Sequence, residues 1–191
     1  AQREQTISVP YPPCLQGVND KVKGMRFGEI DLFTSGTGSG KSTVIKEIIL
    51  HLKETTESSI GIISLEESPG ETVENFIGMA LKKNLADTDL SLEEKREGFE
   101  KVFADKRIKI LDHQGSVSDD SLMDKIETLC LMGCKYLVLD HLTIAVSEVE
   151  ANDANQAVDK VMSDLLKTAK KHNVWIGVIS HLRKTNSNAK S

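Results

Sequence analysis

Residues 34–43 constrain the fold of this chain more than any other stretch, because small polar residues alternate there with glycines and a lysine follows. The run is Thr-Ser-Gly-Thr-Gly-Ser-Gly-Lys-Ser-Thr. Its three glycines leave the backbone free of Cβ clashes, so that successive N–H groups can turn inward around an anion. Lys41 then adds a positive charge that reaches the outer phosphates of a nucleotide, and the Ser42 hydroxyl can ligate Mg²⁺. The pattern predicts a nucleotide-phosphate site.

The sequence on either side of this run supplies the context that a phosphate-binding loop needs. Residues 28–34 alternate apolar and polar side chains, which predicts a strand. The residues after the loop have apolar side chains at helical spacing, and the N-terminus of a helix favours an anion. The full motif has glycine where this chain has Ser35, and a solvated Gly/Ser linker is the alternative interpretation. The predicted phosphate-binding residues are Ser35, Gly36, Thr37, Gly38, Ser39, Gly40, Lys41, Ser42 and Thr43.

Length and charge narrow the classes of protein to consider. A chain of 191 residues is long enough for one domain with a substantial core. The net charge of −5 argues against binding nucleic acid with the whole surface, so such a contact requires a local basic patch. No apolar run approaches the roughly 20 residues that span a bilayer. The 3 cysteines are few and odd in number, which suits a reducing cytoplasm.

The first residues have a composition of their own. Three of the 4 prolines lie within the first thirteen residues, and no helical periodicity surrounds them. We therefore expect residues 1–16 to form an extended arm outside the core, and residues 17–191 to form the domain.

Four more apolar runs predict strands, and amphipathic patterns separate them. The predicted strands cover residues 60–65, 108–111, 136–139 and 174–180, with helical patterns in 72–104, 122–130 and 154–169 and an acidic loop at 147–153. Ser68 and Ser91 each precede a glutamate by three residues, the spacing of a capping box. Within 72–104 the expected buried positions are Phe76, Leu81, Phe99, Val102 and Phe103. Strands that alternate with helices predict an α/β fold with a parallel sheet covered by helices on both faces.

Three polar residues follow strands of this predicted sheet, where ligands of such folds bind. Asp140 comes after four apolar residues and would deliver a carboxylate to Mg²⁺. Glu66 would orient and deprotonate a water in line with the γ-phosphate. The alternative is that Glu66 supports the dipole of the next helix, although Glu67 is the better candidate for that role. His181 would hydrogen-bond the γ-phosphate, or else be a structural histidine.

Asp112 is a rival to Asp140, because residues 112–115 have the D-x-x-G spacing of GTPase loops. Its strand is less apolar, since Lys109 interrupts it, and no guanine-recognition motif follows. We therefore favour Asp140.

The last eleven residues contain three cations and no acid. Arg183, Lys184 and Lys190 could grip the phosphates of a nucleic-acid strand, and a solvated tail is the alternative. No aromatic residue lies among them, so base stacking is not indicated.

Together these segments resemble a known family, the DnaB-type replicative hexameric DNA helicases. The resemblance rests on the order and spacing of residues 17–20, 34–43, 64–68, 137–141 and 179–182. Within that family the chain most resembles the helicase domain of bacteriophage primase-helicases and of Twinkle, and those phage enzymes also tolerate serine at the position of Ser35. The resemblance implies a RecA-like P-loop NTPase core that uses ATP, or another NTP or dNTP, with Mg²⁺.

Carried over residue by residue, the resemblance implies a role for each site residue. It implies that Lys41 and Ser42 bind phosphate and Mg²⁺, that Asp140 binds Mg²⁺, that Glu66 is the catalytic base, and that His181 senses the γ-phosphate. It further implies a homo-oligomeric ring, normally a hexamer, with ATP sites between subunits, single-stranded DNA in the central channel, and an N-terminal arm packed on a neighbour. The same resemblance implies a primase domain or protein as partner. It also favours the cytoplasm of a bacterial or phage-infected cell over the mitochondrial matrix.

The chain departs from the family pattern in two respects. Family members continue with a further motif and an arginine finger donated to the neighbouring subunit, and none of the five arginines here stands where that finger should be. Because such fingers contribute about 10³–10⁵ in rate, we expect residues 1–191 alone to hydrolyse ATP poorly. The loop after Asp140 is acidic, so attraction to DNA would come mainly from Arg183, Lys184 and Lys190.

Two other functions stay open at this point. One is a RecA-like DNA-dependent ATPase without unwinding activity, of the recombinase or ring-switch type. The other is a P-loop kinase of small molecules, which five scattered arginines fit poorly because such kinases use arginines in their lids.

Overall fold

A computed structural model describes residues 8–35, 41–84, 89–114, 120–145 and 151–183, and the structural statements below concern these residues. Their centre is a five-stranded sheet in which every neighbouring pair is parallel, in the order β3-β7-β6-β4-β5. The strands are β3 (Ile30–Ser35), β4 (Ser59–Ser64), β5 (Ile108–Asp112), β6 (Cys134–Ala145) and β7 (Trp175–Arg183). All five predicted strands are confirmed, and β6 runs further than its apolar core suggested.

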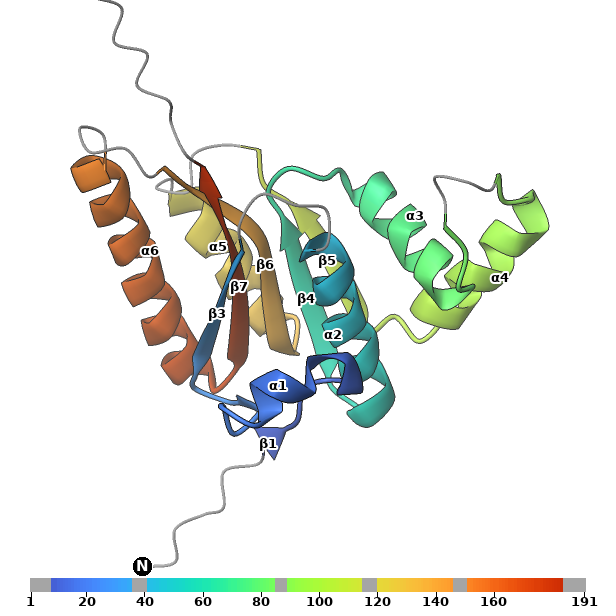
Figure 1. Ribbon diagram of the computed structural model, residues 1–191, viewed down its shortest axis with the longest axis horizontal. Helices are drawn as coiled ribbons and strands as arrows, with labels where there is room; N and C mark the ends of the chain where they lie inside the picture. Colours follow the sequence, from blue (N-terminus) through green and yellow to red (C-terminus); the bar gives the residue numbers. More distant parts are fainter. Residues whose placement is uncertain (1–7, 36–40, 85–88, 115–119, 146–150, 184–191) are drawn as a thin grey trace, which may run out of the picture.

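Helices cover both faces of the sheet, as predicted. Helix α2 (Lys41–Thr55) packs on one face, and α5 (Asp120–Leu131) and α6 (Ala151–His172) pack on the other (Figure 1). The stripe of α2 predicted from its spacing is buried: Ile45, Ile48, Ile49 and Leu52 are at most 1% exposed. Since α6 begins at Ala151, the last part of the expected acidic loop is helical, and residues 147–150 lie outside the described residues.

The long helical pattern at 72–104 holds two helices, α3 (Pro69–Ala80) and α4 (Leu92–Phe103). Each begins at a capping box, in which the serine side chain accepts the N–H of the third helical residue and that glutamate accepts the serine N–H. The pair extends from the β5 side of the sheet (Figure 1). Phe76 and Val102 are buried as expected, whereas Phe99 is 47% exposed, so the prediction that it is buried is wrong.

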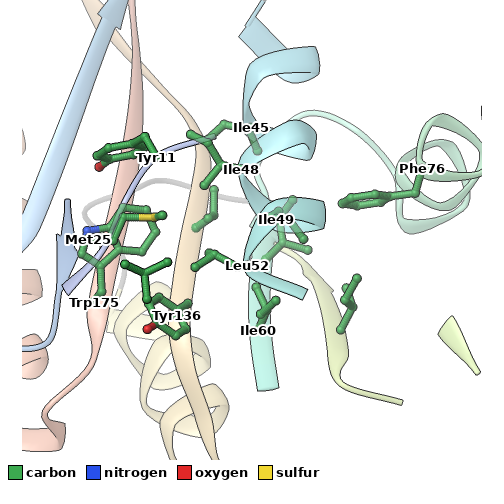
Figure 2. Packing of buried hydrophobic residues seen from close by; sticks show 14 of the residues in the cluster. Tyr11, Met25, Ile45, Ile48, Ile49, Leu52, Ile60, Phe76, Tyr136 and Trp175 are labelled. Carbon is green, nitrogen blue, oxygen red and sulfur yellow. The ribbon is translucent and has the colours of Figure 1, made fainter. Parts of the chain in front are cut away.

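Residues 8–16 do not behave as an arm outside the core. Strand β1 (Ser8–Val9) pairs antiparallel with β2 (Met25–Arg26), and the 3-10 helix η1 (Pro13–Leu15) and α1 (Gln16–Asn19) follow β1. Tyr11 is 2% exposed and lies beside Met25 and Trp175 in the main core (Figure 2). Its hydroxyl donates to Asp31, which also accepts the Trp175 Nε1–H at 2.8 Å. Burial and the nearby Asp31 raise the pKa of Tyr11, so the phenol stays protonated and keeps donating.

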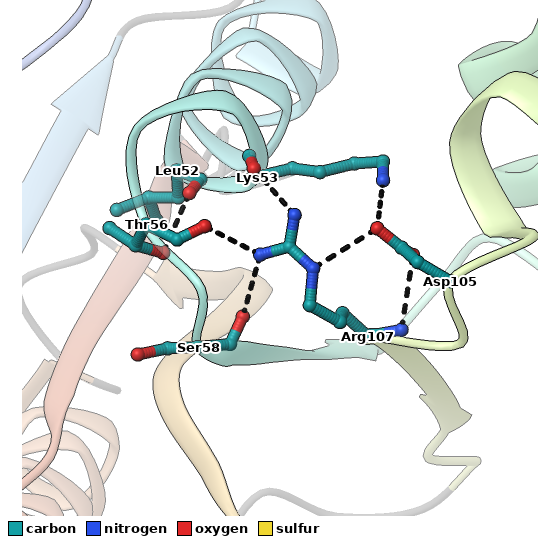
Figure 3. Close-up of polar contacts among 6 residues, drawn as sticks. All are labelled: Leu52, Lys53, Thr56, Ser58, Asp105 and Arg107. Carbon is teal, nitrogen blue, oxygen red and sulfur yellow. Dashed lines mark hydrogen bonds and ion pairs between the residues drawn. The ribbon is translucent and has the colours of Figure 1, made fainter.

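Arg107 fastens the far end of α2 to the beginning of β5 (Figure 3). Its guanidinium donates to the carbonyl oxygens of Lys53, Thr56 and Ser58, at 2.6, 2.7 and 3.2 Å. Helices end in carbonyl groups without partners, and a cation there also complements the helix dipole. Asp105 pairs with both Arg107 and Lys53 and completes the cluster.

In the part of the chain that the structure describes, no helix combines the length and apolar character needed to span a bilayer.

Candidate functional site

The candidate chemistry lies at the C-terminal edge of the sheet. Because all five strands are parallel, Ser35 at the end of β3 and Ser64 at the end of β4 lie on the same edge (Figure 1). Glu66 follows β4 by two residues, while Asp140 and His181 lie within the C-terminal halves of β6 and β7. The sheet order places β7 between β3 and β6, so Asp140 is two strands away from the strand that carries the phosphate loop.

Asp140 lies at an irregularity of β6. Leu139 pairs with Val178 and Leu142 with Ser180, so β6 has one more residue than β7 between these points. This is the arrangement of a β-bulge, a feature that re-aims side chains near active sites. The extra residue belongs to the pair Asp140 and His141, which a cis peptide bond joins.

The surroundings of Asp140 suit a magnesium ligand. Its side chain is 4% exposed, and among the described residues Oδ1 has no hydrogen-bond partner, while His141 Nδ1 lies 3.4 Å from it. An ionised carboxylate oxygen left without a donor is the kind of atom that a hard cation recruits. Within the same described ranges, no three His, Cys, Asp or Glu side chains gather as a metal cage.

Opposing electrostatic effects act on Asp140. Burial raises the pKa of its carboxyl, and Glu67 adds to that effect. The Lys46 ammonium and His141 act in the opposite direction and favour the ionised form. When bound, Mg²⁺ would supply the positive charge that stabilises this buried carboxylate and the phosphates together.

The topology argues against the rival carboxylate Asp112. Asp112 ends β5, and β5 and β3 are the two outermost strands, on opposite sides of the sheet. Four strand spacings of about 4.8 Å put it roughly 19 Å from the phosphate-loop strand, against roughly 10 Å for Asp140.

Glu66 extends from the end of β4 towards His141. Its side chain is 64% exposed, and its Oε2 lies 3.1 Å from His141 Nε2. A carboxylate at this edge that is both accessible and held at one oxygen is suited to activating a water molecule.

Glu67 points into the protein, where three donors hold its carboxylate. Oε2 lies 3.2 Å from Lys46 Nζ and accepts the Thr72 hydroxyl at 2.9 Å, and Oε1 accepts from Asn75. Thr72 and Asn75 belong to α3, and Lys46 belongs to α2. Glu67 therefore has a structural role, which it fills through side chains of two helices; its expected support of the helix dipole stays a prediction.

His181 lies next to this group on β7. Its ring centroid is 5.6 Å from that of His141. One residue earlier, the buried Ser180 hydroxyl donates to Thr34 Oγ1 at 3.0 Å, which joins the end of β7 to the end of β3. The two strands pair in parallel along their length, with Ser35 opposite His181.

Several predicted site residues lie outside the described part of the chain. They are residues 36–40 of the phosphate loop, Lys184 and Lys190 entirely, and the side chains of Ser35, Lys41, Ser42 and Arg183. For Lys41, Ser42 and Thr43 the structure shows the backbone at the beginning of α2, as the motif requires.

Sequence reasoning missed two residues of the site, His141 and Lys46. His141 directly follows Asp140, but its contact with Glu66 depends on the pairing of β4 with β6. Lys46 is 1% exposed and adjoins the buried stripe of α2, and this position was the only signal that could have revealed it.

Comparison with known proteins identifies the family. The family model described as the DnaB-like helicase C terminal domain matches residues 12–191. The DNA helicase/primase of Enterobacteria phage T3 is 32% identical over 187 residues, which are 94% of this chain and 33% of that protein. The chain thus spans about a third of the length of the curated relative.

A solved structure shows the same fold. The ATPase domain of G40P superposes with a TM-score of 0.68 at 17% identity, covering 93% of this chain and 65% of that one. The architecture is therefore α/β and RecA-like, with a parallel central sheet between helices. On the strength of the family match over most of its length, this chain is a member of the DnaB-like helicase C-terminal domain family.

Proposed function

We propose that this chain is the motor domain of a replicative DNA helicase, which hydrolyses ATP to move along single-stranded DNA and unwind duplex. One observation carries the proposal: Glu66, Asp140 and His181 converge at the edge of the sheet where β3 ends, and His141 joins them. The family membership and the helicase/primase name of the phage relative support the same function.

In this proposal each residue has a separate task. Lys41 and the loop at 35–43 bind the phosphates, while Ser42 and Asp140 hold Mg²⁺. Glu66 orients the attacking water and accepts its proton, and His181 detects the γ-phosphate. The rate of hydrolysis then depends on where the Glu66 carboxylate is held.

Assembly and DNA contact belong to the same proposal. The protein forms a homo-oligomeric ring, a hexamer in the simplest case, in which a neighbouring subunit completes each ATP site with an arginine. Single-stranded DNA occupies the channel and contacts Arg183, Lys184 and Lys190, and a primase acts as partner. Such a protein would work in the cytoplasm of a bacterial or phage-infected cell.

The decisive test is Glu66→Gln in the full-length protein. ATP binding should persist, and DNA-stimulated hydrolysis should fall about 10²–10⁴-fold, because the amide cannot accept a proton. Glu74→Gln is the matched control, since Glu74 lies on the surface of α3 with a side chain 60% exposed, and hydrolysis should be unchanged. Unchanged turnover in Glu66→Gln would remove Glu66 from its role.

A strand-displacement assay on forked DNA separates the helicase from a RecA-like ATPase without unwinding. A helicase displaces the strand in an ATP-dependent reaction. Hydrolysis stimulated by single strands without displacement would favour the ATPase, and hydrolysis indifferent to DNA would favour a small-molecule kinase.

A further inference from the structure

The ring of His141 contacts three groups of the candidate site. Nε2 lies 3.1 Å from Glu66 Oε2, Nδ1 lies 3.4 Å from Asp140 Oδ1, and the ring centroid lies 5.6 Å from that of His181. With only 22% of its side chain exposed, His141 is more confined than the glutamate that it contacts. Among the described side chains it therefore connects the proposed base, the proposed metal ligand and the proposed sensor.

Glu66 needs such a partner. A glutamate side chain has three rotatable bonds, and 64% exposure leaves it free to sample many rotamers. The backbone of Glu66 is better determined than its side chain, because the next residue, Glu67, is held by Lys46 and by two side chains of α3. A general base must still bring its oxygen within hydrogen-bond reach of the proton it removes, and misplacement by about 1 Å can cost 10²-fold.

We propose that His141 is a positioning residue that holds the Glu66 carboxylate for water activation. This inference rests on the proposed function of Glu66. The ring N–H at Nε2 of His141 donates to Glu66 Oε2. The second oxygen, Oε1, remains to accept the proton of the attacking water. The bulge at Asp140 and His141 brings the ring to this place on β6, next to the end of β4.

Two amide substitutions separate the two contacts of the ring. In His141→Gln the terminal amide nitrogen reaches about as far as Nε2 and can still donate to Glu66. In His141→Asn the shorter amide reproduces Nδ1, on the Asp140 side, and loses Glu66. A purely structural histidine would be damaged similarly by both changes.

The experiment measures DNA-stimulated ATP hydrolysis by both variants in the assembled protein. We expect kcat to fall about 10- to 100-fold in His141→Asn and to stay within a few-fold of the parent in His141→Gln. In His141→Asn the KM for ATP, the Kd of a non-hydrolysable ATP analogue and the Tm should change little, because this variant keeps the Asp140 side of the ring and loses only the contact with the base. His172→Asn is the matched control, since His172 Nε2 also pairs with a glutamate, Glu127 at 2.8 Å, but lies at the end of α6.

A double-mutant cycle with Glu66→Ala tests whether His141 acts through Glu66. If it does, His141→Asn lowers the residual rate less than 2-fold once Glu66 is gone. An equal loss in both backgrounds, or equal losses in the Asn and Gln variants, would overturn the inference. The role of Glu66 as the base has a separate test: an unchanged kcat in Glu66→Ala would overturn that role. A large loss in Glu66→Ala with no loss in His141→Asn would instead overturn only the role of His141.

Discussion

Lys46 and Glu67 lie 21 residues apart and form a partly buried ion pair, with Nζ and Oε2 separated by 3.2 Å. The pair joins the helix that follows the phosphate loop to the segment that carries Glu66. Only 2% of the Lys46 side chain is exposed, so its charge depends on this partner. The pair therefore links two parts of the nucleotide site that are distant in sequence.

Breaking this pair should destabilise the domain. Lys46→Met should lower the free energy of unfolding by about 3–5 kcal/mol, because it leaves the Glu67 charge buried without a cation. The double variant Lys46→Met with Glu67→Gln should recover most of the lost stability, since the neutral amide can still bond Thr72 and Asn75. Urea unfolding measures both.

Lys95→Met is the control for the ion pair, because Lys95 pairs with Glu74 at 3.6 Å on the surface and should cost less than about 1 kcal/mol. A double variant as unstable as Lys46→Met would contradict this account of the pair.

Asp140→Asn should raise the thermal stability of the domain and weaken its binding of Mg²⁺-nucleotide. Burial raises the pKa of this carboxyl, so its ionised form costs folding free energy, and removing the charge should raise Tm in the absence of Mg²⁺ and nucleotide. The same change should weaken Mg²⁺-dependent nucleotide binding, because an amide is a poorer ligand than a carboxylate. Thermal unfolding and titration with Mg²⁺-nucleotide measure the two effects.

Asp112→Asn is the matched control for Asp140→Asn, since Asp112 is also an aspartate on a strand of the parallel sheet but belongs to β5, the outermost strand on the side away from β3. It should leave nucleotide binding unchanged. A greater loss of binding in this variant than in Asp140→Asn would reverse the assignment of the metal ligand.

Arg107→Ala should lower the free energy of unfolding by about 2–4 kcal/mol. It removes three hydrogen bonds from a cation to carbonyl groups of the last turn of α2 and of the segment that follows it, and leaves those groups short of donors. Arg96→Ala should change stability by less than about 0.5 kcal/mol, because Arg96 is 80% exposed and its ion pair is with Glu100, one turn away on the surface of α4. Similar losses in the two variants would show that Arg107 does not fasten α2.

Asp105 should make part of the stability depend on acid pH. Partial burial by itself raises the pKa of Asp105, but the bonds from Lys53 and Arg107 outweigh it and hold the pKa at about 2. A carboxyl whose pKa is lower in the folded state stabilises the protein above its unfolded pKa and loses that contribution as the pH falls from about 4 to about 2.

The Asp105→Asn variant should consequently be less stable than the parent at pH 6, and the difference should shrink between about pH 4 and pH 2. Chemical unfolding at a series of pH values measures it. Because a third of this side chain is exposed, 0.5 M salt should reduce the difference at pH 6. A difference that stays constant with pH would exclude Asp105 as the titrating group.

Arg183→Ala with Lys184→Ala tests the proposed DNA contact. Each phosphate contact to a single strand contributes about 0.7 to the slope of log K against log salt, so losing two should flatten the slope by about 1.4. Binding to a single-stranded oligonucleotide at several salt concentrations measures the slope. An unaltered slope would place the DNA contact elsewhere.

The local features of this protein were predictable from its sequence because they depend on neighbouring residues. The five strands, the apolar stripe of α2 and the capping boxes at Ser68 and Ser91 all follow from periodicity or from bonds within four residues. Parallel strands also end at a common edge, so the convergence of Glu66, Asp140 and His181 could be expected before any coordinates were known.

The tertiary structure decided which side chains meet at that edge and beneath it. Tyr11 is buried against Asp31 and Trp175, a contact that joins three segments of the chain. Its burial could not be predicted from the sequence, because the proline-rich stretch around it has no apolar periodicity. Periodicity reports only which side of an element is apolar, whereas the partner of a buried charge or a hydrogen-bonding ring depends on sheet order and register. Lys46 therefore meets Glu67, and His141 meets Glu66, only because β4, β6 and α2 pack together in the folded protein.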